Sequence, residues 1–155
     1  MTSAALEIPA LLARYADAFD AGDFAAAAQL FDGGCVVVDG REIAGAENIT
    51  RMWKSFVILY DDGTPRTRHL VTNPAITLGE DGKSAECRSQ WTVIQQVPGE
   101  ALKLVGTGRY HDRFTHDGTS WRFARRDYAA VDFWGDASTH LKDPQLSKDS
   151  SHGNL

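Results

Sequence analysis

Apolar positions repeat with helical spacing through the first twenty residues of the chain. The members of this stripe recur every three or four positions: Ile8, Leu11, Leu12, Tyr15 and Phe19. The spacing predicts an amphipathic helix from Leu6 to about Phe19. Gly22 can end that helix in a left-handed conformation, and Asp23 can cap a second one.

Two further helices are predicted before residue 60. The second has a short apolar face made of Phe24, Ala27, Ala28 and Phe31. The third lies between Gly45 and Tyr60, with apolar positions at Ile49, Met52, Trp53, Phe56 and Leu59. A β-branched run, Cys35 to Val38, predicts a short strand between these two helices.

The rest of the chain has the pattern of strands and tight turns. Four long strands are predicted: Thr67 to Leu78, Ala85 to Val97, Leu102 to Phe114 and Trp121 to Val131. The pairs Asp81-Gly82, Pro98-Gly99 and Asp117-Gly118 separate them, as tight reversals require. Pro74 has no N–H to donate, so it marks a sheet edge or a bulge. Helices followed by a meander predict an α+β fold, with a curved antiparallel sheet packed on three N-terminal helices.

Length and composition fit a single acidic domain. The chain has 155 residues and a net charge of −5, which argues against nucleic-acid binding. No apolar run approaches about 18 residues and no signal peptide is recognisable, so we expect a soluble, cytoplasmic protein with no membrane partner. We predict one domain over residues 1–142 and a flexible polar tail over 143–155. Cys35 and Cys87 are expected to be reduced thiols.

Three stretches carry a resemblance to a known family. They are residues 14–23 (Arg-Tyr-Ala-Asp-Ala-Phe-Asp-Ala-Gly-Asp), 67–73 (Thr-Arg-His-Leu-Val-Thr-Asn) and 108–114 (Gly-Arg-Tyr-His-Asp-Arg-Phe), the last followed by Asp117-Gly118 and Trp121. Together they resemble the SnoaL-like branch of the nuclear transport factor 2-like (NTF2-like) superfamily. The resemblance covers most of residues 5 to 131. It implies a cone-shaped, cystatin-like fold around one apolar pocket.

Within that superfamily the chain is similar to scytalone dehydratase and hexachlorocyclohexane dehydrochlorinase. Both have an Asp at the end of the first helix and a His on the first long strand, and the matching residues here are Asp20 and His69. The dehydratase has a tyrosine where this chain has Phe19. Its second pocket His and its pocket Asn align near Gln95 and Tyr110. The resemblance therefore implies a proton-transfer dyad of Asp20 and His69.

The residues themselves leave alternatives open at both positions. Asp20 stands where a helix C-terminus presents partial negative charge, so we expect a raised pKa there, although a solvent-facing Asp is the plain alternative. His69 shares a strand face with Val71 and Asn73 and can equally be a surface or core histidine.

The strand from Leu102 to Phe114 alternates in a way that separates its polar residues. Gly108, Tyr110, Asp112 and Phe114 share one face, and Arg109, His111 and Arg113 share the other. His111 and His116 therefore lie on opposite sides, so we expect no metal site. Gly106-Thr107-Gly108 is interpreted as a strand bulge.

The leading functional hypothesis is a cofactor-free lyase, a dehydratase or related eliminating enzyme, acting on a small apolar or aromatic carbonyl compound. His69 would remove the proton, Asp20 would orient the imidazole, and Tyr15 or Tyr110 could bind the enolate oxygen. Substrate-binding candidates are Tyr15, Phe19, Trp53, Phe56, Trp91, Tyr110 and Asp112. An isomerase, a polyketide cyclase and a non-catalytic ligand-binding or accessory subunit are the alternatives. A homodimer or larger assembly is expected through the outer sheet face, carrying Val105, Val93 or their alternates.

Overall fold

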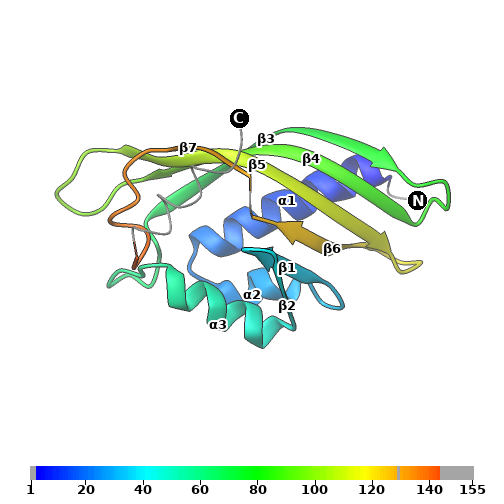
Figure 1. Ribbon diagram of the computed structural model, residues 1–155, viewed down its shortest axis with the longest axis horizontal. Coiled ribbons are helices and arrows are strands. Elements are labelled where there is room, and N and C mark those ends of the chain that lie inside the picture. Colours follow the sequence, from blue (N-terminus) through cyan, green and yellow to red (C-terminus); the bar gives the residue numbers. More distant parts are fainter. Residues whose placement is uncertain (1–2, 129, 144–155) are drawn as a thin grey trace.

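A curved sheet covers one side of three helices in the computed structural model, which describes residues 3–128 and 130–143 (Figure 1). The helices are α1 (Ala4–Asp20), α2 (Phe24–Gln29) and α3 (Ala46–Phe56). The strands are β1 (Cys35–Val38), β2 (Arg41–Ala44), β3 (Thr67–Leu78), β4 (Ser84–Gln95), β5 (Lys103–His116), β6 (Trp121–Asp127) and β7 (Val131–Trp134). The α+β fold predicted from the pattern is confirmed. The predicted polar tail lies, apart from Asp143, outside the described residues.

The sheet has the strand order β2-β1-β6-β5-β4-β3, and β7 pairs with β5. All neighbours are antiparallel except β1 and β6, which are parallel, so the sheet is mixed. Two short strands, β2 and β7, were not predicted. The strand predicted from Trp121 to Val131 ends earlier, at Asp127, and Val131 is the first residue of β7.

The edge strand β3 bends at Pro74. Its register with β4 shifts between Thr72 and Ala75, and Asn73 has a positive φ of 53°. Proline has no N–H to donate to a neighbouring strand. Because β3 lies at the sheet edge, Pro74 costs no hydrogen bond between strands. The bulge or edge predicted from Pro74 is confirmed, and the bend lets β3 follow α1.

The main core lies between the helices and the inner face of the sheet. Its largest buried side chains are aromatic: Tyr15, Phe24, Phe31, Phe114 and Phe123. The predicted alternation of β5 is confirmed, since Tyr110, Asp112 and Phe114 are buried while Arg109 and Arg113 are exposed.

A second, smaller cluster lies at the other end of the inner face, under the chain that follows β7. Val93, Val105 and Ala137 form it, with Trp91, Trp134 and Leu141 packed against them. For the exposed sheet face we named Val105, Val93 or their alternates; both valines are buried, and the alternate Leu104 is exposed. A register shift next to Val93 accompanies the inward position of Val105. We call residues 136–142, which cover this cluster, the closing segment.

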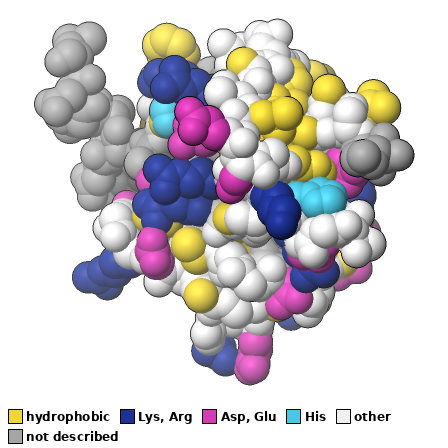
Figure 2. Space-filling view, turned by 90° about the vertical axis from the view of Figure 1, so that its right-hand side faces the viewer, with side chains coloured by type: hydrophobic (Ala, Val, Ile, Leu, Met, Phe, Trp, Pro, Cys, Tyr) yellow, Lys and Arg dark blue, Asp and Glu magenta, His cyan; other side chains and the backbone are white. Residues whose placement is uncertain are grey.

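The surface carries mixed charge. Figure 2 shows the end of the molecule where the turns from β3 to β4 and from β5 to β6 lie, with hydrophobic side chains gathered on one part and acidic and basic ones interspersed around them. Among residues 3–128 and 130–143, no helix combines the length and apolar character that crossing a bilayer requires.

Candidate functional site

Asp20 is the last residue of α1, and its carboxylate is fixed by β3. Oδ1 lies 2.6 Å from Nδ1 of His69 and accepts a hydrogen bond of 2.7 Å from the Thr67 hydroxyl. Oδ2 accepts the backbone N–H of His69 at 2.7 Å. Because α1 packs along β3, one buried carboxylate ties the end of a helix to two adjacent inner positions of a strand. The structure therefore brings together the two residues that the sequence analysis paired.

The pKa of Asp20 is lowered, contrary to our expectation. Burial raises it, but the hydrogen bonds and charge of His69, together with the Thr67 hydroxyl, outweigh that effect. Donors from β3 surround the carboxylate, and they lower its pKa although it stands at a helix C-terminus. Asp20 is consequently ionised at neutral pH.

An ionised Asp20 determines which nitrogen of His69 can act as a base. A carboxylate only accepts hydrogen bonds, so Nδ1 of His69 carries a proton, and in the neutral imidazole Nε2 holds the lone pair. In the described part of the chain, Nε2 has no hydrogen-bond partner. The side chains of His69 and Asp20 are only 6% and 8% exposed, so the pair is shielded from bulk water.

Aromatic rings hold the imidazole in place. The Phe19 ring meets it edge to face with centroids 5.1 Å apart, and Tyr15 does so at 6.5 Å. Trp53 packs on both of these rings, at 5.4 and 5.9 Å. Three of the predicted substrate-binding residues thus form the wall around His69, and all three are buried.

The other four candidates have different surroundings. Tyr110 is buried against Trp91, with ring centroids 6.1 Å apart, and Phe56 is half-buried at the end of α3. Asp112 is the counter-ion of Arg126: its two oxygens accept from Nε and Nη2 at 2.8 and 2.7 Å, and both side chains are fully buried. Both carboxylate oxygens of Asp112 are therefore engaged by Arg126.

Arg126 is a site neighbour that the sequence analysis missed. Its guanidinium lies 3.7 Å from the Tyr110 ring centroid and 4.3 Å from that of Tyr15. Strict alternation from Phe123 would turn Arg125 inward, but a bulge at Ala124 pairs Arg126 with Asp112 instead. The predicted inward position of Asp112 was a signal for such a residue, because a buried carboxylate is stable only beside a cation or hydrogen-bond donors.

Phenol groups surround this cation. Tyr15 and Tyr128 join their hydroxyls at 2.7 Å. Burial raises the pKa of Tyr15, Tyr110 and Tyr128, although Arg126 opposes the rise. All three are neutral hydrogen-bond donors at neutral pH.

A surface hollow reaches Asp20, although His69 is not among the residues that line it. Its volume is about 560 Å³, within the range of small-molecule sites. Asp20, Thr67, Gln95, Arg68 and Leu102 are among its lining residues. None of the seven predicted substrate-binding residues lines this hollow.

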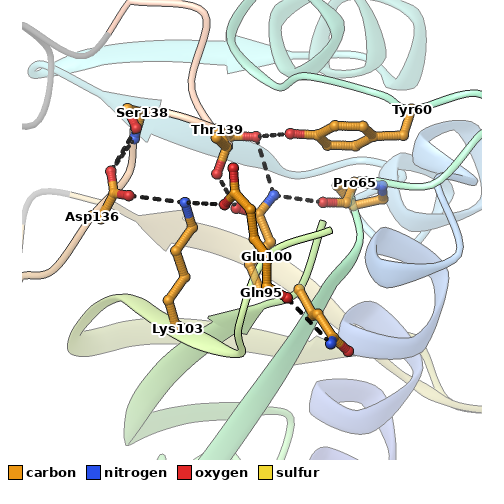
Figure 3. Close-up of polar contacts among 9 residues, drawn as sticks. Tyr60, Pro65, Gln95, Glu100, Lys103, Asp136, Ser138 and Thr139 are labelled. Carbon is orange, nitrogen blue, oxygen red and sulfur yellow. Dashed lines mark hydrogen bonds and ion pairs between the residues drawn. The ribbon is translucent and has the colours of Figure 1, made fainter. Parts of the chain in front are cut away.

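The closing segment completes the site, held by polar contacts (Figure 3). Gln95 donates to the carbonyls of Pro65 and Thr139 at 2.9 and 3.1 Å and accepts the Thr139 hydroxyl at 2.8 Å. Tyr60 donates to the same Thr139 carbonyl, and Lys103 binds Asp136 at 2.8 Å. His140, which follows Thr139, is buried. The sequence analysis did not predict this burial, because the closing segment has no apolar periodicity that would mark it as part of the core.

In the described ranges, no group of three His, Cys, Asp or Glu side chains is arranged to hold a metal ion. Cys35 and Cys87 are free thiols.

Similar solved structures agree on the fold. A variant of a protein of unknown function from Mycobacterium tuberculosis is 27% identical, with a TM-score of 0.66 over 83% of this chain and 76% of that one. A candidate scytalone dehydratase from Novosphingobium aromaticivorans is 19% identical, with a TM-score of 0.64 over 84% and 85%. An NTF2-like protein with a cystatin-like fold from the same organism is 22% identical, with a TM-score of 0.63 over 86% and 84%.

The helix-backed curved sheet therefore has the NTF2-like, cystatin-like fold. Residues 1–127 match the model of the SnoaL-like domain, and the chain belongs to that family. The resemblance seen in the sequence is confirmed. Among proteins with curated descriptions, none matches the chain significantly.

Proposed function

We propose that the protein is an enzyme that moves protons on a small apolar carbonyl compound, with His69 as the base and Asp20 as the residue that orients it. The observation that carries this proposal is the buried pair, joined at 2.6 Å and fixed by two further hydrogen bonds to Asp20. The reaction we favour is a dehydration or related elimination that needs no cofactor.

The proposed chemistry begins at Nε2 of His69. Its lone pair takes a proton from a carbon next to the carbonyl, and the ionised Asp20 stabilises the resulting imidazolium. The electron pair of the broken C–H bond forms the enolate, which then expels a hydroxyl group, and the proton on Nε2 departs with it as water. A positioned base contributes roughly 10²–10⁴ in rate, or about 3–5.5 kcal/mol of barrier.

The aromatic wall supports an apolar, ring-bearing substrate. Phe19 and Tyr15 pack on the imidazole and Trp53 packs behind them, and such surfaces favour flat aromatic, polyketide or terpenoid-type molecules. We propose the hollow beside Asp20 as the route of approach. A neighbour of the same fold is named as a candidate scytalone dehydratase, which is in line with an elimination.

Isomerases and cyclases with the same dyad share the first step, so the test addresses that step. Exchange of α-protons of 1-tetralone and 1-indanone in D₂O, followed by NMR, measures proton abstraction whatever comes after it. We expect the wild type to accelerate exchange, and Asp20→Asn and His69→Gln each to lower the rate by roughly 10²–10⁴. The double variant should lose little more than the worse single one.

Matched controls come from exposed residues away from the dyad. His111→Gln lies on the outer sheet face, and Asp61→Asn lies in the turn after α3; both should exchange at the wild-type rate. Equal rates for His69→Gln and His111→Gln would show that His69 is not the base. A wild type that catalyses no exchange would favour a non-catalytic ligand-binding or accessory subunit.

A further inference from the structure

The closing segment brings the turn that carries His140 to the strand positions across from the dyad. Thr139 binds Gln95, which lies directly across from Thr67, the residue that donates to Asp20. Ala137 packs on Val93, which lies directly across from His69. Two residues that lead into His140 are therefore attached to the strand positions facing the dyad.

The backbone of His140 is also fixed. Its N–H donates to the Ala137 carbonyl at 3.0 Å, and its carbonyl accepts the N–H of Ile58 at 2.9 Å. Leu141 then forms a bridge with Val57 at the end of α3. Because the backbone is bonded on both sides of the His140 Cα, the side chain of His140 has a defined position.

The imidazole of His140 has no partner to explain its burial. The residue is 7% exposed, and its Nδ1 is buried without a hydrogen bond in the described part of the chain. Burial, reinforced by the nearby His69, lowers the pKa of His140 to about 4, while Asp20 opposes the change. A neutral imidazole offers one N–H donor and one lone pair, and leaving either unpaired in the interior is costly.

We propose that His140 is a second functional imidazole of this site and that its Nδ1 forms a hydrogen bond with an oxygen atom of the bound substrate. The inference rests on the proposed function and extends it, because it names the group that holds the oxygen while His69 acts on the carbon. A neutral donor suits this role, since it stabilises a developing enolate without transferring its own proton. Gln95 is the positioning residue that holds the turn.

The test uses 4-nitrophenol, whose oxygen resembles that of an enolate and whose absorbance reports ionisation. Two variants distinguish the effect of losing the Nδ1 atom from the effect of losing the ring volume. His140→Asn keeps a polar nitrogen or oxygen close to the position of Nδ1, whereas His140→Leu fills similar space without one. We expect saturable binding to the wild type, weakening by about tenfold or more in His140→Leu, and much smaller weakening in His140→Asn. Melting curves verify that both variants are folded, and His111→Gln is the control.

The outcomes separate this inference from the proposed function. No saturable binding to the wild type, or equal affinity of His140→Leu and the wild type, overturns the role of His140. Proton exchange that requires His69 but proceeds at the same rate in His140→Leu also overturns it, while leaving the dyad intact. Exchange that does not depend on His69 overturns the proposed function, whatever His140 binds.

Discussion

A buried, neutral His140 makes the stability of the protein depend on pH in a way that one substitution can isolate. The pKa of its imidazole is about 4 in the folded chain, against an ordinary value of 6.5. Below the ordinary value the unfolded chain takes up this proton and the folded chain does not, so protonation favours unfolding. The stabilising contribution of the neutral imidazole is complete above 6.5 and is lost as the pH falls toward 4.

The size of the effect follows from that difference. One pKa unit corresponds to about 1.36 kcal/mol, so lowering the pH from about 7.5 to about 5 should remove about 2 kcal/mol of unfolding free energy through His140 alone. For a chain of this length, that equals a fall in melting temperature of about 4–8 °C. Carboxylates such as Asp20 add their own pH dependence, with a lowered pKa that also favours the folded state at higher pH.

Urea unfolding of the wild type and of His140→Asn at the two pH values measures this contribution, and tryptophan fluorescence can follow it. Groups that both proteins share cancel in the difference. The wild type should lose about 2 kcal/mol more than the variant between about pH 7.5 and about pH 5. An equal loss in both proteins would mean that His140 is accessible to protons in the folded state, and the account of it as a buried neutral group would be wrong.

Two further predictions concern the core and the surface. Asp112→Asn leaves the charge of Arg126 buried without its counter-ion and should cost about 3–5 kcal/mol in urea unfolding, whereas replacing both residues by Leu and Met should cost less; a fully tolerated Asp112→Asn would contradict the pair. Phe133, which pairs with Thr107 on the outer sheet face, is 71% exposed, and Leu104 of the same strand β5 is also exposed, so we expect a homodimer through this face and dissociation by Phe133→Ser in sedimentation equilibrium. A wild-type monomer at micromolar concentration would rule this out.

The regular part of the fold was predictable because each element carries its own signal. The bounds of β3 match the prediction, Thr67 to Leu78, since turn residues flank a β-branched run. The stripe of α1 placed Tyr15 and Phe19 on the buried face. Asp20 and His69 were paired through the family resemblance, not through periodicity, because one Asp and one His leave no pattern of their own.

The features that sequence reasoning missed depend on departures from regular geometry. A one-residue bulge at Ala124 exchanges the roles of Arg125 and Arg126, and no turn residue marks it. The closing segment owes its place to side-chain bonds with Gln95, Tyr60 and Lys103. Contacts of this kind join residues far apart in the chain, so no local pattern can reveal them.

This division also separates the part of the site that β3 fixes from the part that the closing segment supplies. Every hydrogen bond to the Asp20 side chain comes from β3, and none comes from the closing segment. The dyad therefore keeps its geometry if residues 136–142 move away, while His140 moves with them. A ligand that approaches through the hollow beside Asp20, as proposed above, would therefore meet an Asp20–His69 pair whose geometry does not depend on the closing segment.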